Sequence, residues 1–177
     1  MNSKLLCTMG LAGALLICGC GNDDDEFNKG DRNNYPIYNN GNPQQLPVGV
    51  PPVLILDAGT LANTRGAAGV PFSPGATIAD TDTAILQNGV LTITGGNGLL
   101  LTTPNNPDIG VVTGNGTNNV SVALNANSTL ASIQQFLRSV TVASNGGTPV
   151  GANTVTVTVS DGTGQTSQAV IRNINVI

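Results

Sequence analysis

The residues of this chain best suited to chemistry are aspartates that follow residue 52. Four of them are candidate calcium ligands: Asp57, Asp80, Asp82 and Asp161. Calcium takes about six to eight oxygen ligands, often from aspartate carboxylates and loop carbonyls. Asp80 and Asp82 form the best pair, and Asp57 would add a third ligand if the fold brings it to their loop. The alternative is that these aspartates cap turns and keep strand edges soluble.

Asp161 has a specific structural alternative to metal binding. It stands in the segment SDGTG, residues 160–164, between two stretches that suit strands. Asp-Gly is a preferred step where a tight hairpin needs a positive φ. We therefore expect Asp161 to shape a turn.

Residues 53–177 lack the groups that most enzymes and nucleic-acid-binding proteins use. They contain no His, Cys, Lys or Glu and no Gly-x-Ser-x-Gly motif, so a nucleophile with an adjacent base is missing. The whole chain has a net charge of −4. Since phosphate binding depends on clustered Lys and Arg, we expect no nucleic-acid partner, and we predict a domain that is not an enzyme.

The first twenty residues predict export. Lys4 precedes an apolar run, Leu5 to Ile17, that is too short to span a membrane and is typical of a secretory signal. The run ends in Ile17-Cys18-Gly19-Cys20, which resembles the lipobox of bacterial lipoproteins. The resemblance implies a signal peptide over residues 1–19, cleavage before Cys20, and covalent diacylglycerol and acyl chains on Cys20. The alternative is a plain signal peptide that ends near Gly19.

The cysteine count favours the lipid anchor. Cys7 and Cys18 lie within the predicted signal, so the mature chain keeps Cys20 without a disulfide partner. Several acyl chains hold a protein firmly on a membrane. The residue after Cys20 is Gly21, whereas Asp at that place is the inner-membrane retention signal of enteric bacteria. The sequence therefore favours the outer membrane or cell surface.

Residues 20–52 predict a lipid anchor followed by a disordered tether. The segment is rich in Asn, Asp, Gly and Pro, and residues 23–26 form an acidic run, DDDE. Such a composition buries little apolar surface, and its charges keep the chain extended. The tether would let the following domain stand clear of the membrane.

Residues 53–177 predict one all-β domain. Apolar and polar residues alternate in nine stretches, separated by Gly, Pro and Asn-Gly steps. We expect strands at residues 53–57, 76–80, 90–94, 98–102, 109–113, 119–124, 138–142, 153–160 and 168–176. Their spacing favours an antiparallel β-sandwich, and in the stretch 153–160 we expect Val155, Val157 and Val159 to face the core.

One segment breaks the alternation and predicts a short helix near residues 129–137. Leu130, Ile133 and Leu137 recur at helical spacing, and Phe136 joins the same apolar side. Ser128 is the expected N-cap. We expect this helix to cross from one sheet to the other.

Three segments resemble the cadherin-like and immunoglobulin-like repeats of bacterial surface adhesins. They are ATIADTDTAILQNGVLTITGG at residues 76–96, IQQFLRSVTVAS at 133–144 and NTVTVTVSDGTGQTSQAVIRNINV at 153–176. The resemblance covers about residues 53–177 and implies a Greek-key β-sandwich with a structural or adhesive role.

The predicted function is that of a lipid-anchored surface protein with a non-catalytic binding domain. Its membrane contact would be the lipid anchor, and its partner a surface protein or a glycan. The alternative is a calcium- or carbohydrate-binding lipoprotein, with no other cofactor required. Phe72 and Phe136 are the only aromatic residues in the domain, and sugar sites usually stack a ring on an aromatic side chain.

Overall fold

The computed structural model describes residues 49–104 and 107–177. The predicted signal peptide, the predicted lipidation site Cys20 and nearly all of the predicted tether lie outside these residues. No helix in the described ranges is long and apolar enough to cross a membrane.

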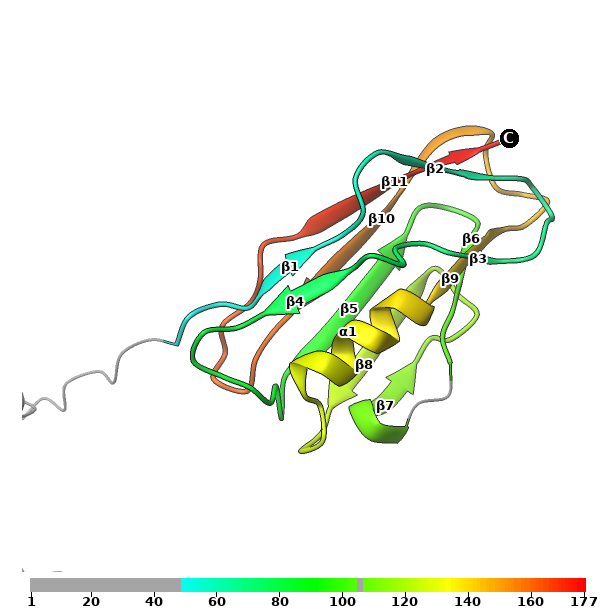
Figure 1. Cartoon of the computed structure of the whole chain (residues 1–177). Helices are drawn as coiled ribbons and strands as arrows, with labels where there is room; N and C mark the ends of the chain where they lie inside the picture. Colours follow the sequence, from blue (N-terminus) through cyan, green and yellow to red (C-terminus); the bar gives the residue numbers. More distant parts are fainter. Residues whose placement is uncertain (1–48, 105–106) are drawn as a thin grey trace, which may run out of the picture. The chain divides into compact units, whose positions relative to one another are not determined.

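The described residues are mostly strands, joined by short connections (Figure 1). The strands are β1 (Val53–Ile55), β2 (Thr60–Asn63), β3 (Val70–Pro71), β4 (Thr77–Ala79), β5 (Val90–Gly95), β6 (Leu99–Thr102), β7 (Gly110–Thr113), β8 (Asn119–Leu124), β9 (Thr141–Ser144), β10 (Gly151–Val159) and β11 (Val170–Val176). A helix, α1 (Leu130–Ser139), precedes β9, and a 3-10 turn, η2 (Pro107–Ile109), precedes β7. The prediction of a β-rich domain with one α-helix is confirmed.

The strands form three sheets. The largest has the order β2-β11-β10-β5-β8-β7, the second has the order β3-β9-β6, and β1 pairs with β4. Every pairing is antiparallel except that of β2 with β11, where Asn173 lies opposite Thr60 in parallel register. The expectation of an antiparallel arrangement is therefore right except at this edge.

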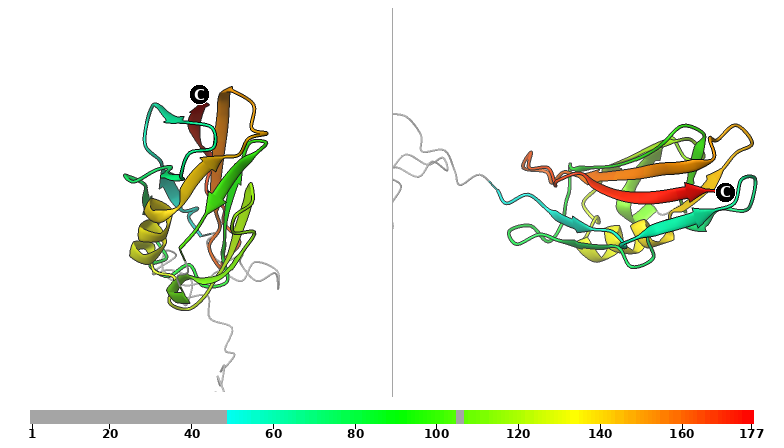
Figure 2. Two further views of the ribbon diagram at one scale, coloured as in Figure 1. Left: turned by 90° about the vertical axis from the view of Figure 1, so that its right-hand side faces the viewer. Right: turned by 90° about the horizontal axis from the view of Figure 1, so that it is seen from above.

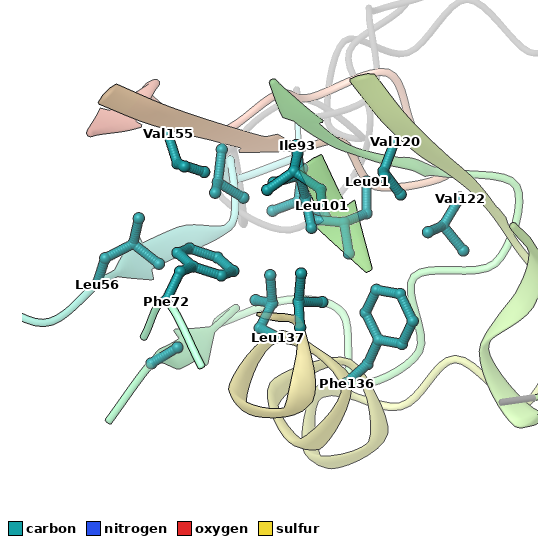
Figure 3. Packing of buried hydrophobic residues seen from close by; sticks show 14 of the residues in the cluster. Leu56, Phe72, Leu91, Ile93, Leu101, Val120, Val122, Phe136, Leu137 and Val155 are labelled. Carbon is teal, nitrogen blue, oxygen red and sulfur yellow. The ribbon is translucent and has the colours of Figure 1, made fainter. Parts of the chain in front are cut away.

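The core lies between the six-stranded sheet on one side and, on the other, α1 together with both smaller sheets, which contribute Leu54, Leu101 and Val142 (Figures 2 and 3). Phe136 and Leu137 point from α1 toward the strands that carry Leu91, Ile93 and Val120. The valines of β10 confirm the alternation: Val155, Val157 and Val159 are fully buried, whereas the threonines between them are not. Because α1 follows a strand of the largest sheet and precedes a strand of the second, it crosses between sheets as expected.

The start of α1 differs from the prediction. Thr129 is the N-cap, and its Oγ1 accepts a hydrogen bond from the Ser132 backbone at 3.1 Å. Ser128 is buried instead, and its hydroxyl donates to the Ile109 carbonyl at 2.9 Å. The predicted cap at Ser128 is wrong because a tertiary contact already uses that hydroxyl.

The end of α1 also differs from the prediction. The helix continues to Ser139, so the strand expected at residues 138–142 begins only at Thr141. The Val140 backbone still donates to the Phe136 carbonyl at 3.1 Å, which extends the helical hydrogen bonding by one residue.

Two strands, β2 and β3, were not predicted. The segment that leads into β2 is held by Arg172 of β11, which is 7% exposed. Its Nη1 donates to the carbonyls of Asp57, Ala58 and Gly59 at 3.0, 2.6 and 2.8 Å, and its Nε donates to the Phe72 carbonyl at 3.0 Å. This buried cation, solvated by backbone carbonyls, places β2 beside β11 through contacts that local alternation does not encode.

Candidate functional site

Two connections carry three of the four candidate carboxylates and lie at the end of the fold where β1 begins (Figure 1). We call residues 80–82, after β4, and residues 161–165, after β10, the acidic loops. A Cβ placed on Gly49 would lie 2.8 Å from Thr163 Oγ1 and 3.1 Å from Asp82 Oδ2, so the chain at Gly49 runs between the two loops. The structure therefore brings these loops to one place.

Asp80 and Asp82 are neighbouring carboxyl groups in one loop, and the Asp82 backbone bonds to Asp80. Asp80 Oδ1 accepts from the backbones of Asp82 and Thr83 at 3.2 and 3.3 Å, while the Val50 backbone donates to Asp82 Oδ2 at 2.7 Å. Burial, together with the side-chain hydrogen bond to Asp82, raises the pKa of Asp80, and the same bond lowers the pKa of Asp82. As pH falls, Asp80 is therefore protonated before Asp82.

Asp161 is 2% exposed and shapes its own turn. Its Oδ1 accepts three hydrogen bonds, from the Thr163 backbone and hydroxyl, both at 2.8 Å, and from the Gln165 backbone at 2.9 Å. The positive φ of this loop, 92°, belongs to Gly164 and not to Gly162. Asp161 therefore organises the turn by accepting backbone hydrogen bonds, and the Asp-Gly step does not supply the left-handed residue.

The second oxygens of two of these side chains have no partner. Asp80 Oδ2 and Asp161 Oδ2 are the buried side-chain oxygens without a hydrogen bond in the described part of the chain. Leaving a buried acceptor unsatisfied costs about 1–3 kcal/mol, so such atoms usually meet water or an ion. Within the described ranges, however, no three acidic, His or Cys side chains gather as a metal-binding group.

Asp57 does not join the acidic loops. Pairing of β1 with β4 places Val53 opposite Ala79 and Ile55 opposite Thr77, so Asp57 lies beyond the opposite end of this ladder from Asp80. Its Oδ2 accepts from the Gly75 backbone at 3.2 Å. Of the four candidates, the structure joins Asp80 to Asp82, brings the turn of Asp161 near them, and leaves Asp57 apart.

A second surface was not singled out from the sequence. We call the side of the six-stranded sheet that faces away from the core the outer face. Its residues are Thr60 and Ala62 of β2; Ile171, Asn173 and Asn175 of β11; Ala152, Thr154, Thr156 and Thr158 of β10; Val90, Thr92 and Thr94 of β5; Asn119, Ser121 and Ala123 of β8; and Val111 and Thr113 of β7. None of them carries a charge. Thr/Val alternation within single strands predicted part of this face, but not the strand order that assembles it.

Comparisons with known proteins give no identification. No protein-family model matches the chain, no curated protein matches it, and no solved structure matches it.

Proposed function

We propose that this chain is a lipid-anchored bacterial surface protein whose folded domain has a structural or adhesive binding role and no catalytic one. The observation that carries the proposal is the sequence Ile17-Cys18-Gly19-Cys20 after a short apolar run. A lipobox explains why an exported chain would keep one Cys with no disulfide partner. Gly21 after this Cys favours the outer membrane or cell surface.

The chemical inventory of the domain supports binding over catalysis. Residues 53–177 contain no His, Cys, Lys or Glu. The Oδ1 atoms of Asp80 and Asp161 are engaged by the backbone of their own loops. The outer face, in contrast, presents hydroxyl and amide groups over six strands. We further propose that the sheets form a Greek-key β-sandwich of the cadherin-like or immunoglobulin-like type, in keeping with the resemblance of residues 53–177.

Metabolic labelling with palmitate tests the anchor. The full chain should take up label and stay in the membrane fraction, and Cys20→Ala should abolish both. Cys18→Ala is the matched control, because it removes a Cys two residues away and leaves a small residue before Gly19. Label that persists in Cys20→Ala, or that is lost in Cys18→Ala alone, would rule out Cys20 as the acylated residue.

A second candidate function is calcium binding at the acidic loops. The observation that favours it is the pair of unpartnered buried oxygens, Asp80 Oδ2 and Asp161 Oδ2, in neighbouring loops. Oxygen ligands are those that calcium prefers, and loop carbonyls, water or a bound partner would complete the set.

Thermal melting of the full chain tests this second candidate. A ligand that binds only the folded state stabilises it by about 2.7 kcal/mol at a hundredfold excess over its Kd. Calcium should raise Tm relative to a chelator, and Asp82→Asn should remove the rise. Equal melting with calcium and with chelator would leave the carboxylates as turn-forming groups only.

A further inference from the structure

The outer face is hollowed at one edge. The hollow has a volume of about 650 Å³ and lies over β2, β11 and β10, beside the connection that follows β5. Its lining residues are Thr60, Gly96, Ala152, Asn153, Thr154, Asn173, Ile174 and Asn175. The hollow therefore joins β2 to the consecutive strands β10 and β11, and β2 becomes their neighbour through its parallel pairing with β11.

The register explains the shape of the hollow. Asn173 lies between Thr60 on β2 and Thr154 on β10, which forms one polar row across three strands. Asn175 lies between Ala62 and Ala152, so the next row has one long side chain flanked by two short ones. Small side chains on both sides leave room around the Asn175 amide.

The amides of Asn173 and Asn175 are available for a ligand. Both residues are exposed, and no hydrogen bond joins either amide to another described residue. Each amide offers two N–H donors and a carbonyl acceptor. Asn153 differs, because its Nδ2 donates to the Pro149 and Gly151 carbonyls at 3.2 and 3.4 Å, which fixes the rim of the hollow.

The side chains of the hollow and the outer face favour some classes of partner over others. Phosphate and nucleic acid require Arg or Lys, and the outer face has neither. Protein interfaces are rich in Tyr, Trp, Phe, Met and Arg, and none of these residues lies on the outer face. Uncharged hydroxyl and amide groups that both donate and accept are complementary to a neutral polyhydroxyl chain.

From this chemistry we propose that the hollow and the adjoining outer face bind a neutral polysaccharide. The polar character continues beyond the hollow in a row of hydroxyls, Thr158, Thr92, Ser121 and Thr113, that crosses four strands. An extended polymer can therefore lie along the sheet. Without an aromatic platform each site binds weakly, and display of many copies on one surface supplies the avidity. In this last respect the inference rests on the proposed surface display.

The test uses the full chain in detergent, fixed to beads through a C-terminal tag on a flexible linker, because an N-terminal tag would be lost with the proposed signal peptide. The probes are fluorescent dextran, mannan and galactan, with anionic alginate as the charged control. Beads should retain at least one neutral probe and exclude alginate, and retention should rise more steeply than linearly with the density of protein. Asn173→Ala combined with Asn175→Ala should lower retention about tenfold or more, as loss of several hydrogen bonds to one ligand predicts.

The matched control is Gln134→Ala combined with Gln135→Ala, which removes two amides from α1, away from the outer face, and should keep retention within about twofold of wild type. Tm of each variant confirms that it is folded. If no neutral probe is retained, or if the asparagine variant retains as much as wild type, the inference is wrong. Because palmitate labelling reports on the anchor alone, a failure of the proposed display and a failure of the hollow give different results.

Discussion

The acidic loops and the outer face use their polar groups in opposite ways. In the acidic loops the carboxylates bond to the backbone of their own loop: Asp161 Oδ1 alone accepts three hydrogen bonds from its own turn. On the outer face the uncharged amides of Asn173 and Asn175 form no hydrogen bond with any other described residue. The aspartates that the sequence singled out as metal ligands thus accept hydrogen bonds from their own loops. The amides of Asn173 and Asn175, which the sequence did not single out, are available to a partner.

The largest expected effect on stability comes from removing the Asp161 carboxylate from its loop. Asp161→Ala removes an acceptor that serves two backbone N–H groups and one hydroxyl in a buried place. We expect the free energy of unfolding to fall by about 2–4 kcal/mol, since the donors lose their partner. Urea denaturation of the full chain measures it. Asn173→Ala, on the outer face, is the control and should change stability by less than about 0.5 kcal/mol.

The next effect concerns the contact between the two connections. A Cβ on Gly162 would overlap the Gln87 carbonyl oxygen, so Gly162→Ala must push this loop away from Gln87 in the connection between β4 and β5. Overpacking of this kind costs about 1–3 kcal/mol. Gly146→Ala is the control, because a Cβ there would meet no atom within 4 Å and its φ is not positive. Thermal melts in which both variants match wild type would show that Gly162 is not packed against Gln87 as described.

The smallest effect on stability is a pH dependence from the carboxyl pair. Because the pKa of Asp80 is raised in the folded state, protonated Asp80 stabilises the fold at low pH, and this contribution is lost as pH rises through the raised value. The lowered pKa of Asp82 acts in the opposite sense, with stability lost as pH falls through its folded value. Asp80→Asn is uncharged at every pH, as protonated Asp80 is, and therefore serves as the reference.

Denaturation from about pH 3 to 7, which brackets the ordinary carboxyl range, tests this pair. Wild type and Asp80→Asn should be closest in stability at the acid end, and the variant should gain by less than about 1 kcal/mol as Asp80 ionises. The same difference at every pH would mean that the pKa of Asp80 is not raised in the folded state.

Local pattern predicted most of the strands because alternation is a property of neighbouring residues. The strand at residues 119–124 is found with the predicted bounds, and the buried valines of β10 follow the predicted period of two. β2 and β3 are short, and they depend on partners far along the chain: β2 on β11 and on the carbonyl contacts of Arg172, β3 on β9. Their existence is a tertiary property, which a local pattern does not carry.

The candidate site shows the same limit. Asp80 and Asp82 meet because they stand two residues apart, which the sequence displays. Asp57 is separated from them by the antiparallel register of β1 and β4, and the hollow of the outer face requires β2, β11 and β10 in that order. Likewise Ser128 has the right residue type for an N-cap, but the Ile109 carbonyl takes its hydroxyl and Thr129 caps the helix. Residue type indicated which side chains were able to bind a metal or cap a helix, and tertiary contacts decided which of them are placed to do so.

The central claim is that the outer face, and not the acidic loops, binds the partner. Its most direct test is attachment of whole cells to a surface coated with a neutral polysaccharide that the protein beads bind. Two nearly isosteric changes in opposite directions should separate the regions: Asn173→Asp puts a charge into the hollow, and Asp82→Asn removes one from the acidic loops. The account predicts that cells displaying Asn173→Asp detach like cells without the protein, while cells displaying Asp82→Asn remain attached. Loss of attachment with Asp82→Asn and full attachment with Asn173→Asp would contradict it and place the binding function in the acidic loops.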